Sequence, residues 1–545
     1  MNKQRLYKFI ILLLLAAILL QGCWLPALPS YNPPSTPVPI ILEEPPEAED
    51  LPPVDPPRAG RFTLRYEPYP YTMNPIIARN RDNIVLISLL YESLFILDEH
   101  LRAVPLLCAS WETEDNTTFT FEILPDILMH DGLPLTADDV AYSIGQARRR
   151  GRHENKLHSI DSVSSDGELT VTVTLNSPNA RFIRLLDIPV IRNGSIESRI
   201  PPGTGPYIFP TEESRLLTRF AGYRHYSELP LTTIHLLECS DGDLTQLFDG
   251  GGLSLLWDDP TGAFDIRVNR HHEPRFYNTT ALQYLGFNAT SYVLRNPDVR
   301  RAIGCSIERQ YIVENIMSVP RPGQTIAAPV AISPIFDMYD PQWEYRSMDP
   351  LVEMAALLER AGLADHDECS YLEISDGLGN WHKFRLNFIV NIENSHKLAA
   401  AHRIADNLRQ FGFDINVREL QWSSFVTALE EGDFDMYYGE TLLGADFDFS
   451  PLLIPGEGSL NYGSTGNTAY RVLIQSFLAA ETQEEVSQAG SRLTTEITLN
   501  APFIPILYKR YAIYSPMGVI TGATPGQSGV FQNFNKWAID LYMLT

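Results

Sequence analysis

Residues 111–144 read WETEDNTTFTFEILPDILMHDGLPLTADDVAYSI, and several local signals agree with one another within this stretch. Phe119 and Phe121 alternate with Thr118 and Thr120, and this period of two is typical of a half-buried β-strand. A turn is expected at residues 130–132, where the sequence is His-Asp-Gly. The stretch therefore predicts strand, turn, strand, turn and helix in succession.

The predicted helix begins after Thr136, whose side chain is suited to cap the unpaired N–H groups of the first turn. Asp138 and Asp139 lie in that first turn, where carboxylates complement the positive end of a helix. The helix has one apolar face, made by Val140, Ile144 and Ala147. The aspartates of this stretch are thus best explained by a turn and a helix start, and not by ligand chemistry.

This stretch resembles the family 5 solute-binding proteins of ABC transporters, a family of peptide, nickel and oligopeptide binders. Their pattern is roughly D-G-x-P-(L/F)-T-A-x-D-V-x-(Y/F)-S, whereas the family's usual R-x-G-V-K-F before the turn is replaced here by LPDILMH. The resemblance implies an α/β fold of the two-lobed periplasmic-binding-protein type, of class II and the large three-domain kind, with discontinuous lobes and a hinge. The matching residues are Asp131, Gly132, Pro134, Leu135, Thr136, Ala137, Asp139, Val140, Tyr142 and Ser143.

Two further blocks are similar to the same family. Residues 203–207 reproduce its G-T-G-P-Y, where two glycines are expected to permit unusual backbone angles. Residues 282–309 resemble its L-x-F-N followed by D-x-R-V-R-x-A-I, with Asn296 and Pro297 predicted to start a helix.

Periodicity predicts the remaining elements. Strand at 384–390, helix at 395–411 and strand at 413–420 imply parallel pairing through a crossover, and hence an α/β lobe. The other predicted elements are strands at 61–66 and 161–175 and helices at 82–97 and 349–362.

Composition excludes several classes of function. A chain of 545 residues with 44% hydrophobic and 20% charged residues is globular and long enough for several lobes. A formal net charge of −25 without a basic stripe argues against binding to nucleic acid. No G-x-S-x-G motif, phosphate loop or distinctive carboxylate pair is present, so we expect no enzyme activity, no catalytic residue and no cofactor.

The first residues indicate the compartment. Basic residues precede an apolar run from Phe9 to Leu20, and Gln21, Gly22 and Cys23 follow, as in a bacterial lipoprotein signal. We expect residues 1–22 to be removed and Cys23 to be lipidated, which would anchor the protein on the outer face of the cytoplasmic membrane. The alternative is an ordinary signal peptide, or an anchor with an incidental cysteine.

The other cysteines are far apart and lack the spacing of metal ligands, so no metal site is predicted. One or two disulfides are open alternatives outside the cytosol, but four cysteines allow three pairings. Buried free thiols are the default for Cys108 and Cys305. These cysteines are Cys108, Cys239, Cys305 and Cys369.

The predicted domain organisation is discontinuous. Residues 23–59 are proline-rich and acidic and form an extended tether. Lobe I is expected to comprise residues 60–95, 200–280 and 510–545, with an inserted domain at 96–199, and lobe II is expected to comprise residues 281–509.

The segment EEGDFDMYYGETLLGADFDFSP, residues 430–451, is the main candidate for ligand chemistry. In the family, an aspartate a few residues before a proline pairs with the ligand's α-amino group in many peptide binders. Asp446 matches that position best, although the usual Gly-Trp is absent and the loop at 439–444 departs from pattern, so Asp448 is the alternative. Both could equally be loop carboxylates of an acidic protein.

Further candidate ligand residues are aromatic or lie near the cleft of related binders. Trp422 and Tyr508 could supply walls for varied side chains, although core packing is the commoner role of such aromatics. Arg79 and Asn80 precede a predicted helix and could lie at the cleft rim or in a solvated loop.

These observations predict a lipid-anchored, extracytoplasmic binding protein, expected to be a monomer, that captures di- or oligopeptides by hinge closure and delivers them to the permease of an ABC importer. Two alternatives stay open. The same fold could bind another solute, such as a nickel chelate, haem or an oligosaccharide, or the protein could serve as a sensor or interaction protein.

Overall fold

The computed structural model of the chain describes residues 60–263, 266–318, 322–344, 349–455, 460–463, 465 and 468–544. The predicted signal sequence, Cys23 and the tether lie outside these residues. Within the described ranges, no helix has both the length and the apolar character that crossing a membrane would require.

A four-stranded sheet in the order β1-β10-β9-β8 draws on two separate parts of predicted lobe I. β1 pairs in parallel with β10, and β9 and β8 continue the sheet antiparallel. The predicted strand at 61–66 is thereby confirmed. The strands are β1 (Thr63–Arg65), β8 (Tyr207–Ile208), β9 (Leu216–Arg219) and β10 (Thr233–Leu237).

The helix predicted over residues 82–97 is shorter than expected. α2 (Arg81–Leu90) ends at Leu90, and β2 (Phe95–Leu97) pairs instead with β3 (Ala103–Pro105). The backbone N–H of Gly205 donates to the Leu90 carbonyl at 3.0 Å and so satisfies the group that would have continued the helix.

The glycines of G-T-G-P-Y explain this contact. A Cβ added at Gly203 would lie 2.4 Å from the Leu90 carbonyl oxygen. A Cβ added at Gly205 would lie 2.3 Å from the Leu90 carbonyl carbon. Neither glycine has a positive φ, so the prediction of unusual backbone angles was wrong. Their role is to let two backbones approach closely.

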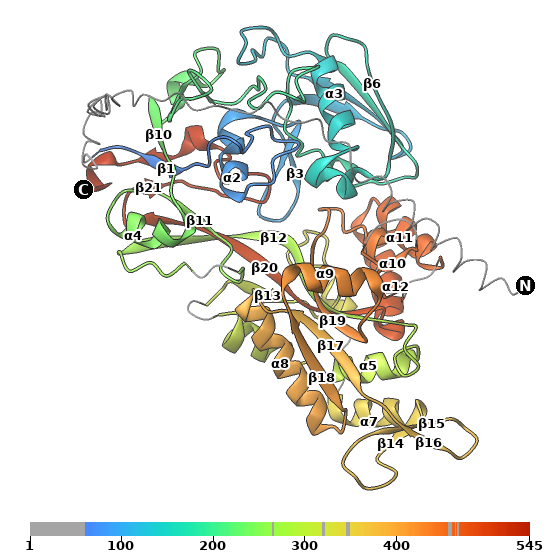
Figure 1. Cartoon of the computed structure of the whole chain (residues 1–545). Coiled ribbons are helices and arrows are strands. Elements are labelled where there is room, and N and C mark those ends of the chain that lie inside the picture. The colour runs from blue at the N-terminus through green and yellow to red at the C-terminus, as the bar shows by residue number, and fades with distance from the viewer. Residues whose placement is uncertain are drawn as a thin grey trace, which may run out of the picture. The chain divides into compact units, whose positions relative to one another are not determined.

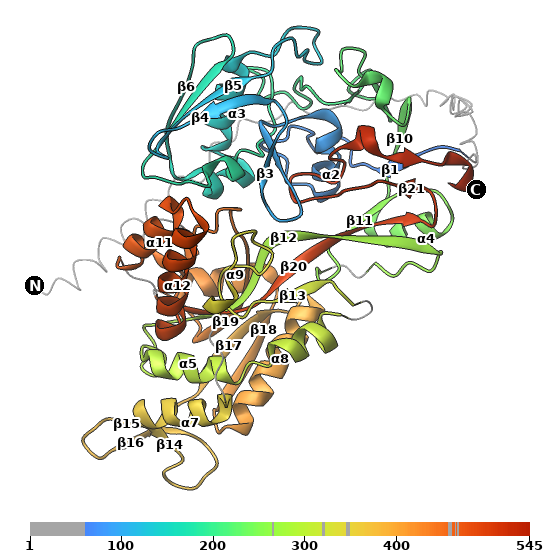
Figure 2. The same ribbon diagram turned by 180° about the vertical axis from the view of Figure 1, so that it is seen from behind.

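The opening stretch forms part of a second sheet, in the order β4-β5-β7-β6, with α3 (Ala137–Ala147) packed on β6 and β7 (Figure 2). The predicted strand and helix are confirmed, and Phe119 and Phe121 are buried. The single strand predicted over 161–175 is a hairpin, because Asp166 accepts backbone hydrogen bonds that close a turn. The strands are β4 (Cys108–Glu112), β5 (Thr118–Ile123), β6 (Ile160–Ser165) and β7 (Thr170–Leu175).

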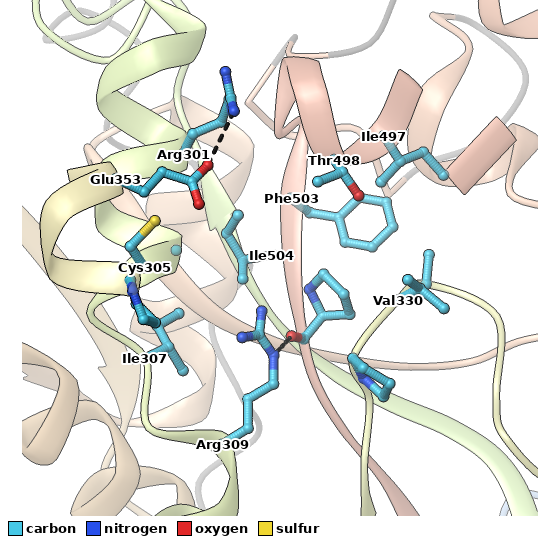
Figure 3. Close-up of a pocket in the computed structure, with 15 residues that line it drawn as sticks. Arg301, Cys305, Ile307, Arg309, Val330, Glu353, Ile497, Thr498, Phe503 and Ile504 are labelled. Atoms are coloured by element: carbon cyan, nitrogen blue, oxygen red, sulfur yellow. Dashed lines mark hydrogen bonds and ion pairs between the residues drawn. The ribbon is translucent and has the colours of Figure 1, made fainter. Parts of the chain in front are cut away.

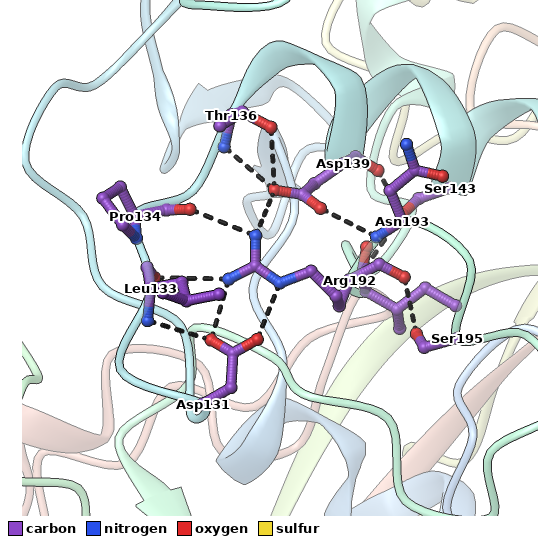
Figure 4. A network of polar contacts seen from close by, with 10 residues as sticks. Asp131, Leu133, Pro134, Thr136, Asp139, Ser143, Arg192, Asn193 and Ser195 are labelled. Atoms are coloured by element: carbon purple, nitrogen blue, oxygen red, sulfur yellow. Dashed lines mark hydrogen bonds and ion pairs between the residues drawn. The ribbon is translucent and has the colours of Figure 1, made fainter.

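Arg192 joins the turn and the helix start of this motif (Figure 4). Its guanidinium binds Asp131 through two hydrogen bonds of 2.8 Å and Asp139 through a third of 2.8 Å. Asp139 also accepts from the Thr136 backbone N–H at 3.0 Å, which forms a capping box. The aspartates of the motif are therefore structural, as predicted.

A seven-stranded sheet in the order β11-β20-β12-β19-β17-β18, with β13 paired to β20, runs through both predicted lobes. β12 (His272–Phe287) and β20 (Phe503–Pro516) form a long antiparallel pair (Figure 1). They cross the predicted lobe boundaries at 280/281 and 509/510, and these boundaries stay a prediction. The other strands are β11 (Leu256–Asp258), β13 (Thr325–Ala327), β17 (Leu386–Asn391), β18 (Ile415–Leu420) and β19 (Met436–Leu442).

Helices cover this sheet as the sequence predicts. α8 (Ser395–Gln410) connects β17 and β18, which pair in parallel. Asn296 caps α5 (Pro297–Cys305), and Asp349 caps α7 (Pro350–Arg360). The remaining helices and small strands are α4 (Leu244–Asp249), α6 (Arg309–Tyr311), α9 (Trp422–Glu431), α10 (Ser450–Leu453), α11 (Tyr470–Ala479), α12 (Gln483–Asn500), β14 (Leu363–Ala364), β15 (Glu373–Ser375), β16 (Trp381–Lys383), β21 (Ile520–Thr521) and β22 (Ala538–Ile539).

The buried apolar residues form several clusters. One joins residues of lobe I and the inserted domain to the C-terminal segment, and two lie mainly within residues 282–508. Leu97 and Leu101 of the inserted domain belong to one of the latter clusters, together with Phe336 and Phe477. Apolar packing therefore links the inserted domain to predicted lobe II.

Candidate functional site

Residues of predicted lobe I and predicted lobe II meet at the middle of the β12–β20 pair, around Lys509. The Lys509 side chain is 2% exposed, and its Nζ lies 2.5 Å from Asp259 and 3.1 Å from Glu440. Glu440 also binds Lys397 of α8 at 3.0 Å and Gln283 at 2.9 Å. Asp259 follows β11 in predicted lobe I, whereas its partners belong to lobe II.

This network favours the charged form of its members. Burial lowers the pKa of Lys509, but the Glu440 and Asp259 carboxylates outweigh it and hold the pKa well above its usual value. Burial raises the pKa of Glu440, but the Lys509 and Lys397 ammonium groups hold it far below its ordinary value. The network is therefore a set of mutually dependent charges.

Aromatic side chains surround one side of the network. Trp257 donates to the Tyr277 hydroxyl at 2.6 Å, and its ring lies 5.3 Å from that of Tyr511 in an edge-to-face contact. The Arg81 guanidinium lies 5.3 Å from the Trp257 ring, and Lys509 lies 5.6 Å from the Tyr511 ring. Aromatic rings and cations thus contact one another at this side of the network.

Asp446 is 2% exposed and faces the inserted domain. Its Oδ2 accepts a hydrogen bond of 2.8 Å from the Asn179 amide, and its Oδ1 accepts a long contact of 3.4 Å from the Asp448 backbone N–H. Burial raises the pKa of Asp446, and the Asp448 charge raises it further. A Cβ added at Gly444 would lie 2.4 Å from Asp446 Oδ1, so a larger residue there would displace this carboxylate.

Asp448 forms a second contact with the inserted domain. Its carboxylate lies 3.2 Å from His158 Nε2 and accepts the Ser450 backbone N–H at 2.8 Å. Burial raises the pKa of Asp448, but the His158 hydrogen bond and charge lower it below its usual value. Burial lowers the pKa of His158, but its bond to Asp448 raises that pKa to about 9. Both predicted ligand carboxylates therefore lie where lobe II meets residues 96–199.

The pH dependence of the His158–Asp448 pair follows from these shifts. Because the folded pKa of His158 lies above its ordinary 6.5, its contribution to stability is complete below pH 6.5 and is lost as pH rises towards 9. We expect the difference in unfolding free energy between wild type and His158→Gln to shrink over that range, as measured by urea unfolding. His402→Gln is the control, because His402 and its partner Glu419 are both solvent-exposed. If the difference in unfolding free energy from wild type changed equally with pH in His158→Gln and His402→Gln, this assignment would be contradicted.

The other predicted ligand residues occupy different surroundings. Trp422 begins α9, is 55% exposed and stacks on Phe425 at 5.9 Å. Tyr508 is fully buried, donates its hydroxyl to the Ala331 carbonyl and packs on Phe447 at 6.2 Å. Trp422 is thus accessible from solvent, whereas Tyr508 lies in the apolar core.

Arg79 is exposed, and Asn80 caps α2 by accepting the Asn83 backbone N–H at 3.0 Å. The segment 439–444, expected to be an altered loop, is mostly strand, because β19 continues to Leu442 and pairs with β12. The ligand roles predicted for Asp446, Asp448, Trp422, Tyr508, Arg79 and Asn80 stay predictions.

The residues that the sequence reasoning missed are Lys509 and Glu440. A signal was available for both, because each is a charged residue within a mainly apolar and aromatic strand, in IPILYKRYAIY and MYYGETL. A charge in such a position is seldom tolerated without a partner. Asn179 and His158 carried no comparable signal, since their partners lie more than 260 residues away in sequence.

The cysteines of the described residues, Cys108, Cys239, Cys305 and Cys369, are free thiols. Cys108 is buried and Cys305 is half-buried. Asp365, Asp367 and Cys369 place ligand-type atoms within 4.8 Å of one another on the surface, but Lys383 lies 2.7 Å from Asp367 and already neutralises that carboxylate.

The sequence profile of the bacterial extracellular solute-binding proteins, family 5, matches residues 102–463. The glutathione-binding protein GsiB of Salmonella typhi is 22% identical over 476 residues, covering 81% of this chain and 87% of that protein. The oligopeptide-binding protein AppA of Bacillus subtilis, solved with a nonapeptide, has a TM-score of 0.64 at 18% identity and covers 88% of this chain and 99% of its own.

NikZ of Campylobacter jejuni, solved with Ni(L-His), has a TM-score of 0.65 at 18% identity and covers 88% of this chain and 100% of its own. These similarities confirm the predicted α/β fold of the periplasmic-binding-protein type. Because the family profile spans most of the folded chain, this protein belongs to the bacterial extracellular solute-binding proteins, family 5.

Proposed function

We propose that this protein captures a di- or oligopeptide between lobe I and lobe II and delivers it to the permease of an ABC importer, without catalysis of its own. Membership of family 5 supports this role, and relatives that bind glutathione or a nonapeptide support a peptide as the ligand. The observation that carries the proposal is the environment of Asp446.

The Asp446 carboxylate is nearly fully buried and has one short hydrogen bond, from Asn179, while its Oδ1 has only the 3.4 Å contact with the Asp448 backbone. Burial and the Asp448 charge keep the pKa of Asp446 raised although the Arg181 guanidinium lowers it, so this buried carboxylate gains from a further cation. The α-ammonium of a peptide would supply that cation through a charge-assisted hydrogen bond. For the peptide to reach it, residues 443–450 must separate from the inserted domain, as in the open state that precedes hinge closure in periplasmic binding proteins.

Asp446→Ala should weaken the binding of free peptides by about 10- to 100-fold, the size of a buried charge-assisted hydrogen bond, and should change the binding of N-acetylated peptides much less. Isothermal titration calorimetry with matched free and acetylated peptides measures this difference. Asn179→Ala is the matched control, since it removes the protein partner of Asp446 and keeps the carboxylate. Equal losses for both peptides in Asp446→Ala would reject Asp446 as the amine partner.

The aromatic cluster supports a second candidate ligand, an oligosaccharide, because Trp257 and Tyr511 offer ring faces for stacking next to Arg81 and Lys509. A nickel chelate or haem fits the same fold. Thermal-shift screening against peptide, sugar and chelate libraries separates these ligands. Absence of any shift would favour a sensor or interaction role.

The attachment of the protein to the membrane rests on the N-terminal sequence. Leu20, Gln21, Gly22 and Cys23 support cleavage before Cys23 and lipidation of its thiol, which would hold a monomer on the outer face of the cytoplasmic membrane. Mass spectrometry of the mature N-terminus tests this: an unmodified Cys23 would reject the lipid anchor.

A further inference from the structure

A pocket lies entirely within predicted lobe II, away from the residues of the candidate site (Figure 3). It has a volume of about 210 Å³ and lies between α5, the start of α7, the end of α12 and β20. The side chains that set the charge and the apolar surface of the pocket are Arg301, Cys305, Arg309, Glu353, Phe503 and Ile504.

One wall of this lobe II pocket is apolar. Phe503 and Ile504 come from the start of β20, Ile497 comes from α12, and Val330 comes from the loop after β13 (Figure 3). All four are at most 7% exposed, so the wall is fixed by packing against the core. Such a wall favours an alkyl or phenyl group over a fully hydrated ligand.

The two arginines of the pocket differ in how their charge is balanced. Arg301 lies 3.2 Å from Glu353 and 3.3 Å from Asp298, so carboxylates of the protein neutralise it. Arg309 donates its Nε to the Pro505 carbonyl at 2.8 Å, and no carboxylate among the described residues lies within ion-pair distance of its guanidinium. The pocket therefore carries one positive charge that the described residues do not balance.

Arg300 shows what a purely structural arginine does in the same region. Its Nε, Nη1 and Nη2 all donate to backbone carbonyls, namely those of Ala501, Leu294 and Asn500. In Arg309 only Nε is used in this way, and this bond fixes the plane of the guanidinium. Its two terminal nitrogens have no acceptor among the described residues, an arrangement suited to a carboxylate.

The charges around Arg309 also restrict the ligand. Burial lowers the pKa of Arg309 to about 10, so the guanidinium stays protonated at neutral pH. Glu353 lies on the opposite side of the pocket and disfavours a second negative charge. The Cys305 thiol is neutral at that pH, because burial raises its pKa to about 11.

We propose that the lobe II pocket binds a small amphipathic monocarboxylate, whose carboxylate pairs with Arg309 and whose alkyl or phenyl group packs against Phe503 and Ile504. This site is separate from the one between the lobes, so it does not depend on the proposed function. A ligand here would contact α5, α12 and β20 without contacting Asp446 or Lys509.

Calorimetry with octanoate as the probe, and octanamide as its uncharged counterpart, tests the charge requirement. We expect octanoate to bind at one site, and octanamide to bind at least about tenfold more weakly, because the charge-assisted bond is lost. Arg309→Gln should weaken the binding of octanoate by a similar factor. Arg403→Gln is the matched control, since Arg403 lies on the surface with Glu308 as its partner, and it should bind octanoate as wild type does. Equal affinities of wild type and Arg309→Gln for octanoate would overturn the proposal.

A second measurement uses the wild-type protein alone and so does not depend on the folding of a variant. Cys305 lines the lobe II pocket, whereas Cys369 lies in the loop between β14 and β15. Octanoate should slow the modification of Cys305 by a methanethiosulfonate reagent and leave the rate at Cys369 unchanged, as followed by peptide mass mapping. Equal rates at Cys305 with and without saturating octanoate would place the bound ligand elsewhere and overturn the proposal.

Discussion

Lys509→Met should lower the free energy of unfolding by about 3 kcal/mol, the lower end of the cost of removing one partner from a buried ion pair. The Lys509 side chain is 2% exposed and is the counter-charge for both Asp259 and Glu440. Without it, Asp259 loses the ammonium 2.5 Å away, and Glu440 keeps its ion pair with Lys397 and its hydrogen bond from Gln283. The lower end applies because both carboxylates retain some contact with water. Urea unfolding measures the loss.

Lys383→Met is the matched control, because Lys383 is exposed and its ion pair with Asp367 is solvated. It should leave the free energy of unfolding unchanged. Adding Asp259→Asn and Glu440→Gln to Lys509→Met should recover part of the lost stability, since the uncompensated charges are then removed. Equal stability of Lys509→Met and Lys383→Met would show that the network around Lys509 contributes nothing.

Arg192→Ala should destabilise the inserted domain by about 3 kcal/mol, because it leaves the nearly fully buried carboxylate of Asp139 without its counter-charge. It also releases the turn that Asp131 and Arg192 hold through two parallel hydrogen bonds. Urea unfolding measures the total loss, and hydrogen exchange should show faster exchange at the start of α3. Arg192→Lys keeps the charge but not the paired geometry, so it should lose an intermediate amount.

Arg150→Ala serves as the control in the same domain, since Arg150 forms an exposed pair with Glu197. Its stability should equal that of wild type. If Arg192→Ala and Arg150→Ala were equally stable, the motif around Asp131 and Asp139 would owe its geometry to the backbone alone.

The sequence predicts elements well where the signal is local. Asn296 caps α5 and Asp349 caps α7 as predicted, and Thr136 occupies the N-cap position of α3, because capping depends on residues within one turn. The helix predicted to Leu97 fails because a distant glycine takes the Leu90 carbonyl, and no pattern near Leu90 reports a partner more than 100 residues away. Local periodicity therefore identifies elements but not where tertiary contacts end them.

The candidate site is predicted less completely for the same reason. Asp446 was selected by resemblance, and its neighbours Asn179 and His158 come from the inserted domain, which the sequence does not pair with it. Lys509 and Glu440 become neighbours only through the register of β19 and β20 on either side of β12. Register between strands of such separation is a property of the folded sheet and not of either strand.

The β12–β20 pair carries a mechanical consequence. Its ladder is continuous except at residues 279–281 and between Gln283 and Tyr284, where the register shifts, and a continuous ladder resists bending. We expect any rotation of one lobe against the other to be concentrated in this irregular section of the ladder. Thr279 and Thr280 lie in that section and donate their hydroxyls to the carbonyls of Lys509 and Leu443. A ligand that displaces the chain around Leu443 would therefore act directly on the Thr280 hydrogen bond, which lies in this irregular section of the ladder.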